Sequence, residues 1–149
     1  MTAPDPDSDR AARPLDEAAV RERLGTDHGA VLDAVAATAD ALASGDEPFT
    51  DGQALASALE DGLAETEVLD RLPAVLATAV DAAGLTLAAD PVAAPPYVTV
   101  TSRGPILRGS TPKGRLVVRL AVFDIDRAPR RYIRTPAPGR LALRIDLKQ

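Results

Sequence analysis

The fold is decided by the stretch RLVVRLAVFDI, residues 115–125. Its side chains alternate between two faces of an extended strand. One face is apolar and consists of Leu116, Val118, Leu120 and Val122. The other face carries Arg115 and Arg119 together with Val117, Ala121 and Phe123. An antiparallel sheet with one apolar face needs a cover on that face, so the stretch predicts a sheet that is buried on one side and basic on the other.

Further strands are expected on both sides of this stretch. Residues 97–103 alternate, residues 106–108 suit a short strand, and residues 109–114 have the composition of a loop. Residues 130–134 and 140–147 are expected to form a hairpin, because the intervening TPAPG segment is typical of a turn. The apolar residues of the last strand, from Leu141 to Leu147, alternate and are expected to point inward. The strand part, residues 97–148, thus predicts an antiparallel sheet of three to five strands.

A helical period precedes the strands, over residues 14–84. Pro14 suits the first turn of a helix that ends near Gly25, and a second helix follows as far as residue 44. The sequence TDGQ at residues 50–53 is a capping box that starts a third helix. A fourth begins after Thr66, and Pro73 either kinks it or starts a new helix. We therefore expect an α+β fold with about four helices on the sheet, in a single domain over residues 14–149, after a disordered acidic tail over residues 1–13.

Charge divides the chain at the same place as the secondary structure. Residues 1–90 hold 19 of the 22 acidic side chains, whereas residues 91–149 hold 12 of the 17 basic ones, and the net charge is −5. Arginine greatly outnumbers lysine and aspartate is abundant, a composition typical of salt-loving archaea. The chain has no cysteine, no long apolar run and no signal-peptide pattern, so we expect a cytoplasmic protein that does not contact a membrane.

The arginines of the strand part form the candidate interaction face. Its members are Arg103, Arg115, Arg119, Arg130, Arg131, Arg134, Arg140 and Arg144. A flat basic face can hold phosphate backbones, but few aromatic residues are available to stack on bases. The same arginines can instead pair with the chain's own acidic helices, with an acidic protein partner or with solvent. Nucleic-acid binding is therefore an alternative rather than the favoured interpretation.

No pattern of catalytic residues accompanies this face. Asp124 and Asp126 lie two residues apart, with Asp146 on another strand, and such carboxylates can hold Mg²⁺ or Ca²⁺. A small metal-dependent hydrolase around Asp124 and Asp126 is thus a second alternative, although solvated carboxylates at a strand end are the more ordinary interpretation. His28, the single histidine, is expected to be a packing residue. We expect no cofactor and no catalytic residue.

Three segments resemble a known group of sequences. The segment VAAPPYVTVTSRGP at residues 92–105, GRLVV at residues 114–118 and DHGAVLDAV at residues 27–35 are similar to small haloarchaeal proteins that share a domain of unknown function. The resemblance implies a haloarchaeal, cytoplasmic protein and brings no ligand, partner or catalytic residue with it. A rich apolar core pattern without convergent catalytic groups predicts, independently of the resemblance, a binding or scaffolding protein without enzymatic activity, acting as a homodimer or with an acidic protein partner.

Overall fold

The computed structural model describes residues 15–149, so the predictions for Pro14 and for the acidic tail lie outside the described residues. The helical part contains α2 (Glu17–Ala43), α3 (Gly52–Glu65), the 3₁₀ turn η1 (Leu69–Arg71) and α4 (Leu72–Ala82). The strands are β1 (Val98–Thr101), β2 (Gly104–Thr111), β3 (Gly114–Ala121), β4 (Phe123–Arg127), β5 (Arg130–Arg134) and β6 (Ala142–Lys148). The α+β prediction is confirmed, with three α-helices in residues 15–149 instead of about four.

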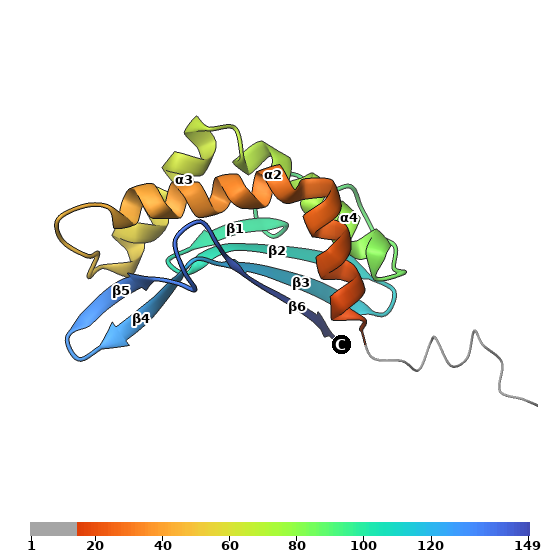
Figure 1. Cartoon of the computed structure of the whole chain (residues 1–149). Coiled ribbons are helices and arrows are strands. Elements are labelled where there is room, and N and C mark those ends of the chain that lie inside the picture. The colour runs from red at the N-terminus through yellow and green to blue at the C-terminus, as the bar shows by residue number, and fades with distance from the viewer. Residues whose placement is uncertain (1–14) are drawn as a thin grey trace, which may run out of the picture.

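The strands form a main sheet and a separate ribbon. The main sheet is antiparallel with the order β1-β2-β3-β6, and β4 pairs only with β5. All three α-helices lie along one face of the main sheet, and the described residues leave the opposite face uncovered (Figure 1). Helix α3 lies over β1, α4 over β2 and α2 over β6. This layering gives the sheet a buried inner face and an open outer face.

The two helices expected on either side of Gly25 are one bent helix, α2. Asp16 caps it by accepting a hydrogen bond from the Ala19 amide at 3.1 Å. Gly25 destabilises a helix interior by only about 1 kcal/mol, and burial of Leu24 and Val31 on either side of it offsets that cost. The bend comes instead at His28, whose φ of −130° is not helical. The half-buried His28 ring shares a hydrogen bond of 2.8 Å with the Thr78 hydroxyl of α4, which agrees with a packing role.

The next two helices begin and end at clear local signals. Asp51 caps α3 by accepting from the Gln53 amide at 2.9 Å, within the expected capping sequence. Thr66 was expected to start the fourth helix but ends α3, because its hydroxyl donates to the Gly62 carbonyl at 2.9 Å and satisfies a C-terminal acceptor. Pro73 lies in the first turn of α4, where it has no amide hydrogen to leave unpaired.

The inner face of the sheet holds the core that the alternation predicted. Register pairs Leu116 with Leu147, Val118 with Ile145 and Leu120 with Leu143. The three β3 residues have no exposed surface. Strand β2 is longer than the expected 106–108 and runs through Gly109, where a Cβ would lie 2.4 Å from Leu87. Glycine is thus needed in this strand for close packing, which the sequence alone does not distinguish from a loop glycine.

The expected single strand over residues 115–125 is interrupted at Val122. The amides of Val122 and Phe123 both donate to the Arg103 carbonyl, at 2.7 and 3.1 Å, so the chain leaves the main sheet at this point. It continues as β4 and returns as β5, which pairs Asp124 with Ile133. The predicted hairpin between residues 130–134 and 140–147 is therefore wrong, because β5 pairs with β4 whereas β6 pairs with β3.

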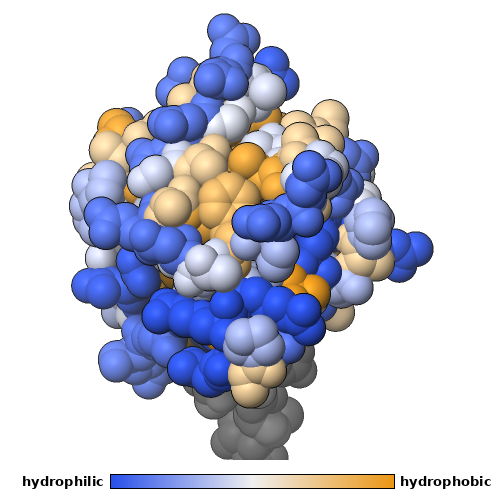
Figure 2. Space-filling view, turned by 90° about the vertical axis from the view of Figure 1, so that its left-hand side faces the viewer, coloured by the Kyte–Doolittle hydropathy of each residue, from blue (hydrophilic) through white to orange (hydrophobic). Residues whose placement is uncertain are grey.

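The ribbon forms one end of the molecule. The Tyr132 amide of β5 donates to the Phe49 carbonyl at 2.8 Å and attaches the ribbon to the connection between α2 and α3. Figure 2 views this end and shows an apolar area within a largely hydrophilic surface. Ile133 of β5, 42% exposed, is one of the large exposed hydrophobic side chains of the described residues. No helix within residues 15–149 has the length and apolar character of a membrane span.

Candidate interaction face

The outer face of the main sheet, as we call it below, consists of the strand residues that point away from the helices. In the register of β2 and β3, Ile106 lies opposite Arg119, Arg108 opposite Val117 and Ser110 opposite Arg115. The same register places Arg119 opposite Arg144, Val117 opposite Asp146 and Arg115 opposite Lys148. The charged members of the outer face are Arg108, Arg115, Arg119, Arg144, Lys148 and Asp146. Five cationic side chains thus share one uncovered face with a single carboxylate.

The candidate face predicted from the sequence includes three of these cations and leaves out two, Arg108 and Lys148. Arg115, Arg119 and Arg144 lie on the outer face, as the alternation of side chains along each strand predicted. Arg108 was missed because the strand that carries it was expected to end there. The signal was present in the continued alternation of β2, in which Leu107 and Gly109 are buried and Arg108 and Ser110 face outward. Lys148 lies on the outer side of β6 by the same alternation of side chains.

An apolar floor lies beneath the charges. Val117 is only 2% exposed although it points away from the helices. It lies between Arg108 and Asp146 in the register, and its neighbours along β3 are Arg115 and Arg119. Long arginine stems cover apolar surface while their guanidinium groups stay in water. The stems therefore already cover Val117, and Ile106, half-buried opposite Arg119, is an apolar side chain of this face that stays partly accessible.

Two hollows on the outer face meet at Arg119. One has a volume of about 480 Å³ and is lined by Arg108, Arg115, Val117, Arg119, Lys148 and Gln149. The other has a volume of about 390 Å³, and among its lining residues are Ile106, Arg119, Phe123 and Arg144. Both are partly open to solvent and are lined by residues of neighbouring strands. Their shape suits an extended segment better than a compact small molecule.

Charge on this face is only partly balanced within the chain. Arg119 donates to Asp146 at 3.0 Å, and the two side chains are 37% and 48% exposed. Arg144 stands directly opposite Arg119, and like charges in that position repel each other. Within residues 15–149 no ion pair neutralises Arg144, Arg108, Arg115 or Lys148. A carboxylate from a partner would relieve this repulsion.

Three predicted members of the face lie beside it. Arg103 is in the turn between β1 and β2 and approaches Asp124 at 3.8 Å. Arg131 is on the ribbon and pairs with Asp126 at 3.2 Å. Arg130, also on the ribbon, lies within 3.5 Å of the Tyr132 hydroxyl. Arg103 and Asp124 line the hollow of about 390 Å³ together with Arg119 and Arg144, so they border the outer face. Arg130 and Arg131 belong to the ribbon and do not line that hollow.

Arg134 is not part of an interaction face, which corrects the prediction. Its side chain is only 8% exposed and donates to the Asp40 carboxylate of α2 at 2.9 Å. It also donates to four backbone carbonyls, which belong to Ala36, Val122, Thr135 and Arg140. Asp40 in turn accepts from the Gly139 amide at 2.8 Å. The pair therefore fastens the 135–140 connection to α2, and the separation of 94 positions between its members leaves no local sequence signal.

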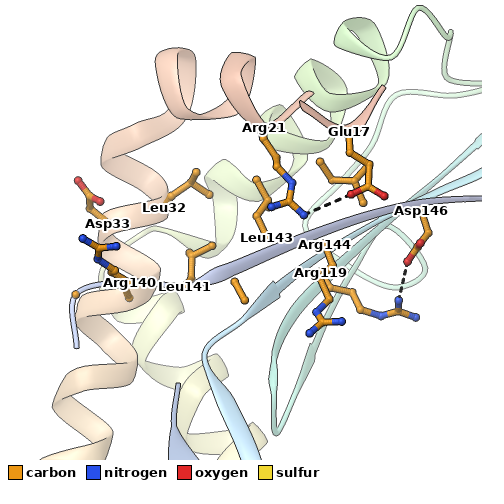
Figure 3. A pocket seen from close by; sticks show the side chains of 14 residues that line it. Glu17, Arg21, Leu32, Asp33, Arg119, Arg140, Leu141, Leu143, Arg144 and Asp146 are labelled. Carbon is orange, nitrogen blue, oxygen red and sulfur yellow. Dashed lines mark hydrogen bonds and ion pairs between the residues drawn. The ribbon is translucent and has the colours of Figure 1, made fainter. Parts of the chain in front are cut away.

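Arg140 also lies off the outer face, because it precedes β6 at the edge of the sheet. It stands near Asp33 of α2, at one end of a groove of about 740 Å³ (Figure 3). Residues from both faces of β6 line this groove, including Leu143 on the inner side and Arg144 on the outer side. Arg140 therefore belongs to the free edge of the sheet and to α2.

The Tyr132 hydroxyl has a distinct environment. The Arg130 guanidinium hydrogen-bonds to it, and together with the Ser102 hydroxyl holds the pKa of Tyr132 below its ordinary value of 10.0, although burial of the ring acts in the opposite direction. Gly52, at the start of α3, leaves room for this hydroxyl, since a Cβ there would lie 2.5 Å from it. The arrangement seats the ribbon against α3.

Each carboxylate that was considered as a metal ligand lies beside an arginine. Asp124 faces Arg103, Asp126 accepts from Arg131, and Asp146 accepts from Arg119. Among residues 15–149, no three His, Cys, Asp or Glu side chains come close enough together to hold a metal ion. Asp146 therefore does not join Asp124 and Asp126 in one cluster.

A comparison with protein families covers nearly all of the described chain. A family model for a domain of unknown function, DUF7988, matches residues 18–148, from the second residue of α2 to the end of β6. Neither the curated proteins nor the solved structures contain a match to this chain. The expected relation to a domain of unknown function is confirmed: the chain belongs to the DUF7988 family.

Proposed function

We propose that this protein is a binding module without enzymatic chemistry, and that its outer face holds an extended, acidic segment of a partner protein. The observation that carries the proposal is the set of five cations and one carboxylate on a sheet face left open by the described residues. The helical side carries most of the acidic side chains and is unsuited to such a partner. Charge complementarity therefore points to the outer face.

The apolar floor favours a protein segment over a nucleic acid. Ile106, half-buried opposite Arg119, suits an apolar side chain that alternates with carboxylates. Aromatic residues are few on this side of the described chain: Tyr97 lines a small hollow with Arg108 and Arg115, and Phe123 is only 3% exposed, so bases would find little stacking surface there. Nucleic-acid binding through the arginines is thus an outcome to be tested. A metal-dependent hydrolase around Asp124 and Asp126 gains no supporting observation.

The cellular setting forms part of the proposal. We infer a haloarchaeal cytoplasm from the excess of arginine over lysine and from the abundance of aspartate. At about 1 M salt the Debye length is roughly 3 Å, so distant charges no longer attract a partner. Arginines in direct, bidentate contact with carboxylates are the groups best suited to hold a partner under such conditions. We therefore expect binding to weaken between about 0.1 M and about 1 M KCl.

Fluorescence anisotropy with a fluorescein-labelled decaglutamate peptide tests the proposed function. Combined Arg115→Glu and Arg119→Glu substitution should weaken binding at least tenfold, which corresponds to about 1.4 kcal/mol. Combined Arg23→Glu and Arg71→Glu substitution changes the net charge equally on the helical side and serves as the matched control. We expect the control to bind within about twofold of the native chain, since exposed distant charges contribute little.

Three outcomes would contradict the proposed function. The first is no binding of decaglutamate at low salt, and the second is equal loss of binding in both double variants. The third is a clear preference for oligonucleotides over the peptide, which would favour the nucleic-acid alternative. Labelled single-stranded and double-stranded oligonucleotides are therefore measured in the same series.

A further inference from the structure

We propose that two copies of this chain associate through β6, which pairs with itself in antiparallel orientation about a two-fold axis at Ile145. The inference goes beyond the proposed function and does not depend on it. It rests on the free edge of the sheet, on the order of charges along β6 and on the groove beside this strand.

Strand β6 is at one edge of the main sheet and pairs only with β3. Within residues 15–149, no backbone hydrogen bond outside that pairing involves residues 141–148. Alternate amide and carbonyl groups of β6 therefore face away from the sheet without a backbone partner. A strand edge of this kind is a template for another strand.

The charges of β6 select one self-pairing register. A register must keep inner residues opposite inner residues, so the axis passes through a single residue of the strand. An axis at Ile145 places Arg144 opposite Asp146 of the second copy, and this pair occurs twice because of the symmetry. Axes at Arg144 or Asp146 would oppose like charges, and axes at Leu143 or Leu147 would overlap only one end of the strand. Pairing about Ile145 uses the whole strand and two pairs of opposite charge.

The same register supplies what each copy lacks. Arg144 faces Arg119 within its own chain, and a second Asp146 would give it a carboxylate. Asp146 is 48% exposed, so it remains accessible while it pairs with Arg119. On the inner side, Leu143 would meet Leu147 of the second copy, and both are half-buried in the single chain. Charge and apolar contact therefore agree on one register.

Helix α2 does not close this edge. Figure 3 shows α2 above β6, with Leu32, Leu141 and Leu143 on the inner side of the strand and Arg144 and Asp146 on the outer side. The groove of about 740 Å³ contains residues of both sides, as expected of an edge that is open to solvent. The groove leaves room for the side chains of an added strand. Pairing of the two β6 strands would join the outer faces of the two copies into one continuous basic surface.

Sedimentation velocity across a range of protein concentrations tests the proposal through exchange of charge. Arg144→Asp places two acidic side chains opposite each other, and Asp146→Arg places two basic ones opposite each other. Each single variant should therefore dimerise at least tenfold more weakly than the native chain. An equal mixture of the two variants should dimerise again, because every cross-strand pair then has opposite charges.

Lys148→Asp provides the matched control. It lies on the same strand and face and changes the net charge as much as Arg144→Asp, but it faces Ala142 in the proposed register. Its dimer should stay within about threefold of the native one, since no charged pair is lost. Circular dichroism confirms that all variants fold. A native chain that stays monomeric at every concentration would overturn the proposal, as would a mixture that fails to dimerise or a control as impaired as Arg144→Asp.

Discussion

Arg134 and Arg131 lie on the same strand, and the structure predicts very different consequences when each is replaced by methionine. Arg134→Met removes a guanidinium that is 8% exposed and contacts Asp40 at 2.9 Å. Arg131→Met removes one that is 48% exposed and contacts Asp126 at 3.2 Å. Methionine retains much of the aliphatic stem in both cases, so the comparison isolates the charged group.

The size of the effect follows from burial. Removal of one partner of a buried pair costs about 3–5 kcal/mol. Asp40 is 33% exposed, and water can partly replace the lost guanidinium, which places the expected loss near the lower limit of about 3 kcal/mol. For a chain of this length that loss lowers the melting temperature by roughly 6–12 °C. Loss of the exposed pair in Arg131→Met costs between about 0 and 1 kcal/mol.

Urea unfolding of both variants, followed by far-UV circular dichroism, measures the two losses directly. We expect a markedly lower midpoint for Arg134→Met and a nearly native midpoint for Arg131→Met. If the two variants lost the same stability, the buried contacts of Arg134 with α2 and the 135–140 connection would not be the reason for its position. A small loss in both would lead to the same conclusion.

Three further predictions concern the backbone, the ribbon and the core. Gly104 has a φ of 142°, and a Cβ there would lie 1.9 Å from a backbone oxygen. In urea unfolding, Gly104→Ala should therefore lower the free energy of unfolding by about 3 kcal/mol or more. Gly139→Ala, with open space around it, should lower it by about 1 kcal/mol. In a Tyr97→Phe variant, ultraviolet absorbance should show Tyr132 ionising with a pKa below 10.0. The lowered pKa adds stability only as the pH rises toward 10.0, and at neutral pH the ionisation adds none; a midpoint at or above 10.0 would contradict the hydrogen bonding described for its hydroxyl. Leu116→Ala should cost about 2–5 kcal/mol, measured by thermal unfolding, because the side chain has no exposed surface; a change under about 1 kcal/mol would contradict its place in the core.

The two faces of the sheet could be predicted because alternation is a local signal. Leu116, Val118 and Leu120 identify the inner side of β3, and the arginines between them must then face outward. The pairing of β5 could not be predicted in the same way. Residues 130–134 have a suitable composition to pair with either neighbour, and the break at Val122 depends on the Arg103 carbonyl, which only the folded structure brings there.

The candidate face was predictable to the same extent. The alternation of side chains placed Arg119 and Arg144 on the correct side of the sheet, because both lie inside regular strands. It could not separate Arg134 from Arg131, since the difference between them is a distant aspartate on α2. Likewise, the interior glycine at position 25 suggested a helix end, whereas burial of the residues around it keeps α2 continuous. Local patterns thus revealed which side of a strand is polar, and tertiary contacts decided which polar groups remain available.

Chemical-shift mapping of the decaglutamate complex tests most directly whether the outer face is the binding surface. The backbone amides of ¹⁵N-labelled protein are followed as the peptide is added at low salt. The account predicts that the shifted amides cluster in residues 106–110, 115–119 and 144–148, while those of α3 and α4 stay in place. Shifts concentrated on the helices, or spread evenly over the molecule, would contradict it.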